Sequence, residues 1–274
     1  MTRWISFLTD YGLADGFVAA CHGVIAAIAP EARVLDVTHL VPPQDVRRGA
    51  AVLAETVAYL PPGVHLSVVD PGVGTGRRAV VLVTRDRVFV GPDNGLLIPA
   101  VEVTGAVRVA HVIADPRLWR HPVSRTFHGR DVFAPVAAYL ARGVPAAAVG
   151  PPLDPATLVR LPDPVRRRDD DVLVVEVLTV DGFGNAQLAA GPGDLDLSPD
   201  GGVLLEAVGR QHALWYTGAF ADVPAGAPLL FVDSVGRLAL AVNCGSAAVR
   251  FGVRAGDVVR LAPVPPPQTA GRGG

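Results

Sequence analysis

The order of apolar runs in the first seventy residues constrains the fold more than any other feature. Short apolar runs alternate with longer segments of helical character, as strand, helix, strand, helix, strand, at residues 4–10, 15–30, 32–39, 43–63 and 64–70. This alternation predicts a parallel α/β sheet. Asp15 and Asp45 stand where the two helices should begin, and we expect each to act as an N-cap.

The remainder of the chain changes character twice. Residues 77–95 read as two strands joined by a turn at Arg85–Arg87, and a helix is expected at Val132–Gly143. Prolines and a block of charge make Val159–Asp171 the expected linker. Beyond it, short strand-like runs cut by Gly, Pro and Asp turns indicate a small β-barrel or sandwich. We therefore expect an N-terminal α/β, sandwich-like domain with a mostly parallel sheet at 1–165, a smaller C-terminal domain at 172–262, and a disordered tail at 263–274.

Composition excludes several classes of protein. The 274 residues carry a net charge of −2, so nothing indicates binding to nucleic acid or to an anionic membrane. All 24 cationic residues are arginine, which rules out a P-loop lysine and a Schiff-base lysine. Two distant cysteines, Cys21 and Cys244, do not suggest a disulfide framework or a thiolate metal site. We expect a cytoplasmic protein, because the first apolar stretch is too short for a signal peptide and no uncharged apolar run is long enough to span a bilayer.

The segment "SVVDPGVGTGRRAV" places three glycines at alternate positions directly after an apolar run. A dinucleotide-binding loop needs its glycines to open a helix, yet the residues after Gly76 are β-branched and strand-like. We therefore interpret the segment as a turn that delivers Asp70 and Arg77 to one place. Asp70 stands at the end of an apolar strand, where ligands gather in open α/β sheets.

Three further polar clusters each permit a structural explanation as well as a functional one. His128, in "SRTFHGRDVFAP", precedes a helix and could be a surface or core histidine. Asp10, in "LTDYG", could be a turn residue, and a hairpin turn alone would explain Asp181 and Asn185 in "TVDGFGNAQL". The agreement among the first clusters is stronger than any one of them, because Asp10, Asp70 and His128 are each expected where a strand of one sheet ends.

Six motifs occur in order along the chain: "FLTDYG", "DVTHLVPPQDVRRGA", "VDPGVGTGRRAV", "GPDNGLL", "TFHGRD" and "DGFGN". Together they resemble the S-adenosylmethionine hydroxide adenosyltransferase family, the relatives of the fluorinating and chlorinating enzymes, over residues 4–262. The resemblance implies an N-terminal α/β domain and a C-terminal β-barrel. It also implies homotrimers whose active sites lie between the N-terminal domain of one subunit and the C-terminal domain of the next.

The reaction implied by the resemblance converts S-adenosyl-L-methionine and water into adenosine and L-methionine, with no cofactor and no metal. Asp70, Arg77 and His128 match the family's Asp-Arg-His set, which handles the attacking water. The formal base stays open between Asp70 and His128. Arg78 is adjacent to Arg77 and could take the role assigned to it. One of the two arginines could be only a solvated charge.

Substrate contacts are implied in the same way, residue by residue. Asp10 resembles the aspartate that binds the ribose hydroxyls, and Asp181 matches the position that meets the methionine ammonium. Asn185 aligns with the asparagine on the adenine side. Ser234, in "FVDSVG", and Asn243, in "AVNCG", match on spacing the serine at the methionine end and the segment along adenine.

Departures from the halogenating relatives favour hydrolysis. Asp70 stands where those enzymes carry a tyrosine beside the halide, and an ionised carboxylate repels a halide. His128 and Gly129 replace the segment that lines their halide pocket, and Gln44 replaces a tryptophan of the fluorinating enzyme. Val235 stands where that enzyme has an arginine, so the partner of the methionine carboxylate stays open.

Two rival functions remain. One is a metal-dependent hydrolase that uses Asp10, Asp70, His128 and Asp131 as ligands. The other is a non-catalytic module that binds adenosine or S-adenosyl-L-methionine. Turnover in the presence and absence of EDTA separates the three possibilities.

Overall fold

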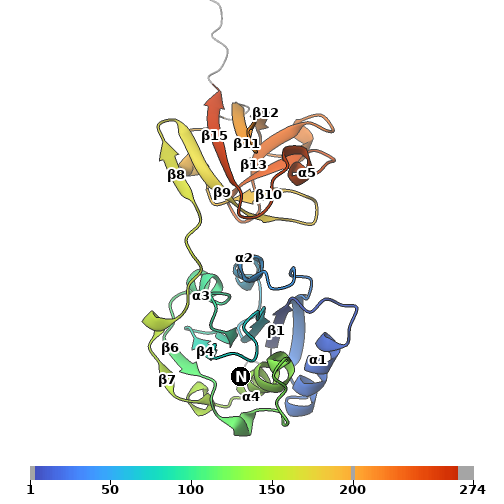
Figure 1. The fold of residues 1–274 in the computed structure, drawn as a ribbon, viewed down its shortest axis with the longest axis vertical. Coiled ribbons are helices and arrows are strands. Elements are labelled where there is room, and N and C mark those ends of the chain that lie inside the picture. The colour runs from blue at the N-terminus through green and yellow to red at the C-terminus, as the bar shows by residue number, and fades with distance from the viewer. Residues whose placement is uncertain (1–3, 199–200, 265–274) are drawn as a thin grey trace, which may run out of the picture. The chain divides into compact units, whose positions relative to one another are not determined.

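The computed structural model describes residues 4–198 and 201–264 (Figure 1). The described residues divide after Leu161 into two compact units, an N-terminal unit and a C-terminal unit. In the described part of the chain, no helix combines the length and the hydrophobicity needed to cross a membrane.

The N-terminal unit is built on one seven-stranded sheet with the strand order β2-β1-β3-β5-β4-β6-β7. Pairing is parallel from β2 through β1 and β3 to β5, and antiparallel from β5 through β4 and β6 to β7. The parallel half contains the three strands expected from the alternating pattern. The elements are β1 (Trp4–Thr9), α1 (Phe17–Ile28), β2 (Arg33–Thr38), α2 (Val46–Val57), β3 (Val64–Val68), β4 (Ala79–Val83), β5 (Val88–Pro92), α3 (Ile98–Thr104), β6 (Val109–Val112), α4 (Ala134–Ala141) and β7 (Pro152–Leu153).

Helices cover both faces of this sheet (Figure 1). On one face, Cys21 and Ile25 of α1 and Val136 of α4 pack in one apolar cluster with Phe7 of β1. On the other face, α2 and α3 pack against residues such as Leu82 of β4. Because both faces are covered, every residue of β3 is buried, which is the pattern expected of a strand in the middle of an α/β sandwich.

The C-terminal unit is a closed seven-stranded barrel, as the resemblance implied. Around the ring the strands follow the order β10-β14-β13-β12-β11-β15-β9, and β9 pairs with β10 to close it. All these pairs are antiparallel except β12 with β13. The elements are β8 (Arg166–Asp169), β9 (Val172–Val180), β10 (Ala186–Leu188), β11 (Gly202–Ala207), β12 (Arg210–Tyr216), β13 (Pro228–Val232), β14 (Leu238–Val242), α5 (Ala247–Phe251) and β15 (Val258–Val264).

The two expected N-caps differ in outcome. The Asp45 carboxylate accepts a hydrogen bond from the backbone N–H of Arg48 at 2.9 Å and caps α2 as predicted. The prediction for Asp15 was wrong, because α1 begins one residue later, with Gly16 at the N-cap position and no side-chain cap.

Two expectations about segment ends also change. Within the expected linker, Arg166–Asp169 form β8, which pairs with β9. All four of its residues are exposed and none is apolar, so the alternation of apolar and polar residues that predicts a strand is missing from this segment. Strand β15 runs through Val264, two residues into the expected tail, and residues 265–274 lie outside the described part of the chain.

Candidate active site

The carboxyl ends of β1 and β3 position two aspartates. Asp10 follows β1 directly, and Asp70 follows β3 after one intervening residue. The two strands pair in parallel with Thr9 opposite Val68, so both carboxylates leave the sheet at the same edge, as predicted. Ligand sites of open α/β sheets form at this edge.

The glycine-rich loop joins Asp70 to Arg77. The Arg77 Nε donates to both Asp70 carboxylate oxygens, at 2.9 and 3.0 Å, and the Nη2 donates to Oδ2. Gly74 has a positive φ of 76°, and a Cβ there would lie 2.3 Å from the Arg125 carbonyl oxygen. The glycine thus lets the loop approach the segment that leads to His128. The loop is a turn that pairs Asp70 with Arg77, as the sequence predicted.

Arg77 also contacts His128. Its Nη2 lies 3.0 Å from the His128 Nδ1. A guanidinium only donates, so Nδ1 accepts and the proton of the neutral imidazole resides on Nε2. Burial lowers the pKa of His128, and the positive charge of Arg77 lowers it further. His128 is therefore neutral at neutral pH and presents an N–H at Nε2.

The three side chains rest on the core. The Arg77 guanidinium lies 5.0 Å from the centre of the Phe133 ring, a cation–π arrangement. The side chains of Asp70 and Arg77 are only 7% and 13% exposed. His128 was expected at the end of a strand, and this expectation was wrong. His128 precedes a π-helical turn, Gly129–Phe133, that leads into α4.

Asp131 anchors the segment that carries His128. Its fully buried carboxylate accepts hydrogen bonds from Arg130 Nε at 2.7 Å, Arg120 Nη1 at 3.2 Å and the Ser124 backbone N–H at 2.8 Å. The pKa of Asp131 is lowered by these hydrogen bonds and charges, against the effect of burial. Asp131 has a structural role that leaves little of its carboxylate for a metal ion.

Arg78 does not share the role of Arg77, and it is not a solvated charge either. Its Nε donates to the buried Asp93 carboxylate at 2.7 Å, and its Nη1 donates to the Thr157 hydroxyl at 3.2 Å. Arg78 therefore ties the end of the sheet to the last segment of the N-terminal unit.

Tyr11 is a site residue that the sequence analysis missed. A Cβ on Gly129 would lie 1.8 Å from the Tyr11 hydroxyl, so the glycine after His128 makes room for this phenol. Burial raises the pKa of Tyr11 well above its usual value, and the charges of Asp10 and Asp70 add to the effect. Its place directly after Asp10 in "FLTDYG" was the signal available in the sequence.

The Asp10 carboxylate is held by backbone from the segment before α2. Its Oδ2 accepts a hydrogen bond from the Gln44 N–H at 2.8 Å. Gln44 adopts a left-handed conformation with a φ of 66°, which is uncommon for a residue with a side chain. This conformation directs the N–H at Asp10 and fixes the orientation of the carboxylate.

In the C-terminal unit the structure brings Asp181 and Asn185 together. The Asn185 Nδ2 donates to Asp181 Oδ2 at 2.9 Å, and the Asn185 backbone N–H donates to Oδ1 at 2.8 Å. Asn243 follows β14 and donates from Nδ2 to the Val223 carbonyl at 2.8 Å. Ser234 is exposed in the turn between β13 and β14.

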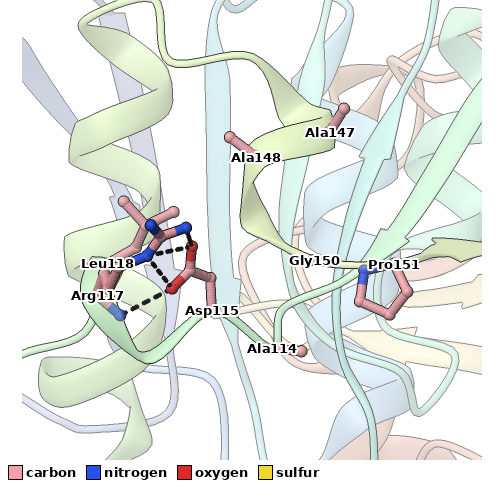
Figure 2. A pocket seen from close by; sticks show the side chains of 8 residues that line it. All are labelled: Ala114, Asp115, Arg117, Leu118, Ala147, Ala148, Gly150 and Pro151. Carbon is pink, nitrogen blue, oxygen red and sulfur yellow. Dashed lines mark hydrogen bonds and ion pairs between the residues drawn. The ribbon is translucent and has the colours of Figure 1, made fainter.

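A hollow of about 600 Å³ lies elsewhere in the N-terminal unit, between residues 114–118 and 147–151 (Figure 2). The charged side chains that line it are Asp115 and Arg117, which form an ion pair with 2.6 Å between Oδ2 and Nη2. Its lining includes none of the predicted site residues, so it does not define the candidate active site.

Both units of the chain match domains of one known protein family. Residues 5–150 match the SAM hydroxide adenosyltransferase N-terminal domain, and residues 175–260 match the C-terminal domain of that family. A protein of Salinispora tropica named (R)-S-adenosyl-L-methionine hydrolase is 56% identical over 260 residues, 95% of this chain and 98% of that one. A fluorinase of Actinoplanes sp. is 28% identical and covers 94% of this chain and 96% of its own.

Among solved structures, an uncharacterized conserved protein from Thermotoga maritima superposes with a TM-score of 0.86. It shares 38% sequence identity and covers 94% of this chain and 99% of its own length. The similarity therefore extends over nearly the whole chain.

Proposed function

We propose that this chain, which belongs to the SAM hydroxide adenosyltransferase family, is an enzyme that hydrolyses S-adenosyl-L-methionine to adenosine and L-methionine. The relative that is 56% identical over nearly its full length is named for hydrolysis of the (R) form of this substrate. The structural observation that carries the proposal is the contact of one guanidinium, Arg77, with both Asp70 and His128.

The step that needs catalysis is the attack of water, which is a weak nucleophile. Water attacks the ribose C5′, a C–O bond forms, and the C5′–S bond breaks with its electron pair passing to sulfur. The sulfonium becomes a neutral thioether, so the leaving group needs no general acid. The attacking water becomes a protonated alcohol as the new bond forms, and this species is a strong acid. A carboxylate is therefore basic enough to accept the proton, which is then released to solvent.

We assign the proton acceptor to Asp70. A carboxylate oxygen has two lone pairs, and Oδ1 of Asp70 accepts only one hydrogen bond from Arg77, so this oxygen retains acceptor capacity for the proton. His128 Nδ1 is engaged by Arg77, which leaves its Nε2–H to orient the water as a donor. Arg77 fixes both partners and holds the neutral form of His128. Alignment of this kind supplies a large part of the rate enhancement in displacement reactions.

A halide is a less suitable nucleophile for this site. Asp70 carries a negative charge where the attacking group must approach, and like charges repel strongly in a partly buried site. Neutral water meets no such barrier. The family includes fluorinases at 28% identity, but this carboxylate argues for hydrolysis here.

The metal-dependent alternative requires carboxylates that are free to bind an ion. Asp70 is paired with Arg77, and Asp131 with Arg130 and Arg120. These guanidiniums supply the positive charge that a metal would provide. A non-catalytic binding module is the other alternative, and turnover decides it.

The substrate contacts follow the resemblance. Asp10 binds the ribose hydroxyls, supported by the fixed orientation of its carboxylate. Asp181 meets the methionine ammonium, and Asn185, in hydrogen-bond contact with it, meets adenine. Ser234 and Asn243 contact the methionine end and the adenine, respectively.

The assembly that we propose is a homotrimer with active sites shared between subunits, in the cytoplasm. The family resemblance supports the trimer, and the two distant cysteines, which do not suggest a disulfide framework, support the compartment. Light scattering on the purified chain would show three subunits, and a monomer would contradict the proposal.

Turnover is tested by incubating the protein separately with the (R) and (S) forms of S-adenosyl-L-methionine in ¹⁸O-labelled water, with and without EDTA. We expect adenosine carrying ¹⁸O at its 5′ position, unlabelled methionine, and a kcat that EDTA does not change. Loss of kcat in EDTA would favour the metal-dependent hydrolase, and saturable binding without turnover would favour the binding module.

The role of Asp70 is tested with Asp70→Asn, which keeps the shape of the side chain and removes its charge. We expect kcat to fall on the order of 10²- to 10⁴-fold while adenosine still binds. Asp115→Asn, which alters an ion-paired aspartate in the unrelated hollow, is the matched control and should leave kcat unchanged. An Asp70→Asn enzyme with full activity would remove this carboxylate from the mechanism.

A further inference from the structure

Three potential metal ligands converge on one face of the N-terminal sheet, in residues that the proposed reaction does not use. His22 lies in α1, Asp36 in β2, and His39 just after that strand. Their ligand atoms all lie within 4.8 Å of one another. The Asp36 Oδ1 is 2.9 Å from the His22 Nε2 and 3.1 Å from the His39 Nε2.

Within this group the His22 Nε2 and the Asp36 Oδ1 are in hydrogen-bond contact, whereas the buried member, His39, has a ring nitrogen that is not satisfied. Its side chain is 3% exposed, yet its Nε2 has no hydrogen-bond partner among the described residues. The Asp36 oxygen at 3.1 Å is close enough for a hydrogen bond but is not aligned for one. Buried polar atoms are normally satisfied, so this nitrogen requires an explanation.

The other ring nitrogen of His39 has a partner that can accept a proton, which allows the Nε2 to be unprotonated. His39 Nδ1 lies 2.9 Å from the Thr9 hydroxyl oxygen, which also accepts a hydrogen bond from the Tyr11 N–H. The hydroxyl has a second lone pair, so it can accept the Nδ1 proton. The Nε2 then directs a lone pair toward the Asp36 carboxylate. Two electron-rich atoms at this distance are stable together when a cation lies between them.

We propose that His22, Asp36 and His39 form a binding site for a divalent transition metal ion of the Zn²⁺ class. Two imidazoles and one carboxylate are a donor set that Zn²⁺ prefers, with water as a further ligand. Tetrahedral zinc with bonds near 2.0–2.1 Å separates its donors by about 3.3 Å. The two Asp36–imidazole distances reach this value with shifts of a few tenths of an ångström.

The surroundings of the ligands support such a site. Both imidazoles pack against Phe7, with ring centres at 5.8 Å for His22 and 4.8 Å for His39, which restricts their orientation. Thr9 supplies the outer hydrogen bond that orients a ligating histidine in most metal sites. His22 and Asp36 are 35% and 44% exposed, so an ion and its water ligand can enter from solvent.

An ion at this position would stabilise the loop that carries Asp10. Thr9, the partner of His39, immediately precedes Asp10 in the chain. The Gly12 backbone N–H donates to the His39 carbonyl at 2.7 Å, so the loop is tied to His39 on both sides of Asp10. The ion takes no part in the reaction, and its role is to position this loop.

The test is calorimetric titration of tag-free, chelator-treated protein with ZnCl₂, repeated with CoCl₂ while visible absorption is recorded. We expect one equivalent of metal per chain and Co²⁺ absorption bands typical of four or five ligands. His22→Ala and Asp36→Asn should abolish stoichiometric binding. Thr9→Val, which removes only the outer hydrogen bond, should weaken it on the order of 10- to 100-fold.

His121→Ala is the control, because it removes an exposed histidine outside the cluster and should leave binding intact. Circular dichroism checks that each variant is folded, and His22 is the safest position because it is partly exposed on a helix. The proposal is overturned if the wild-type chain binds no stoichiometric Zn²⁺, or if His22→Ala binds as tightly as the wild type. In the first case the cluster is held by hydrogen bonds and close polar contacts alone.

Discussion

His65 is a buried histidine of β3 whose pKa is lowered to about 3, chiefly by burial and further by the nearby charge of Arg87. Its side chain lies in the core with 1% of the residue exposed. The Arg87 Nη1 donates to His65 Nε2 at 3.2 Å, so the ring proton is on Nδ1, which lies 2.7 Å from the Ser6 hydroxyl. The folded protein therefore holds this imidazole neutral.

Burying a neutral histidine makes the folded protein less stable at acidic pH. An unfolded chain binds a proton at this histidine below pH 6.5, whereas the folded chain does so only near pH 3. The unfolded state thus binds more protons between these values, and stability falls as the pH falls. One pKa unit corresponds to about 1.4 kcal/mol, so this histidine lowers the free energy of unfolding by about 2 kcal/mol at pH 5 and by about 4 kcal/mol near pH 3. At neutral pH the effect is close to zero.

The perturbation is His65→Gln, which offers an acceptor to Arg87 and cannot titrate. Urea unfolding is followed by tryptophan fluorescence at pH 7, 6 and 5. We expect the variant to be less stable at pH 7 because it loses the packing of the ring against Phe89. The difference from wild type should then shrink by about 2 kcal/mol at pH 5. Ser6→Ala, which keeps the imidazole, should retain the acid dependence, and parallel pH curves for wild type and His65→Gln would refute the reasoning.

Two more predictions concern the site and the cysteines. Gly129→Ala should displace Tyr11 and lower kcat/KM at least tenfold, because the added Cβ would overlap the hydroxyl, whereas Gly23→Ala in α1 meets no atom within 4 Å and should leave activity unchanged. An active Gly129→Ala enzyme would show that Tyr11 can move without consequence. A disulfide exchange reagent should label Cys244, which is exposed, in the native protein and reach Cys21 only after unfolding, since Cys21 is buried and its thiol pKa is raised to about 12. Rapid native labelling of two thiols would contradict this.

The parallel half of the sheet was predictable because each apolar run there is separated from the next by a helix of ordinary length. Helix α3 was not, since "IPAVEVT" is short and rich in β-branched residues that favour strands. It is helical because its apolar face packs with α2 over the sheet. Tertiary packing thus overrides local preference in this segment.

The candidate site was predictable to the extent that its partners are close in sequence. Asp70 and Arg77 are joined by a short glycine-rich turn, and their pairing followed from it. His128 lies far along the chain; the strand end expected for it was wrong, whereas the resemblance placed it correctly with Asp70 and Arg77. Tyr11 was missed because an aromatic residue after a strand is equally typical of a core position.

The ligands of the proposed metal site illustrate the same limit. His22, Asp36 and His39 come from a helix, a strand and a turn, at spacings that match no local metal-binding motif. Each residue alone is an unremarkable polar side chain. Only the pairing of β1 with β2, and the packing of α1 over them, brings the three together.

The double engagement of Arg77 has a consequence for attempts to redesign this enzyme. In the part of the chain that the structure describes, Asp70 and His128 share no hydrogen bond with one another, but both contact one guanidinium, so a change at either alters the orientation and charge that the other experiences. Their mutational effects should therefore be strongly non-additive, with the second substitution costing far less than the first. In libraries that vary only one of these two positions, most variants would therefore lose activity. A new nucleophile specificity requires that Asp70 and His128 be replaced together.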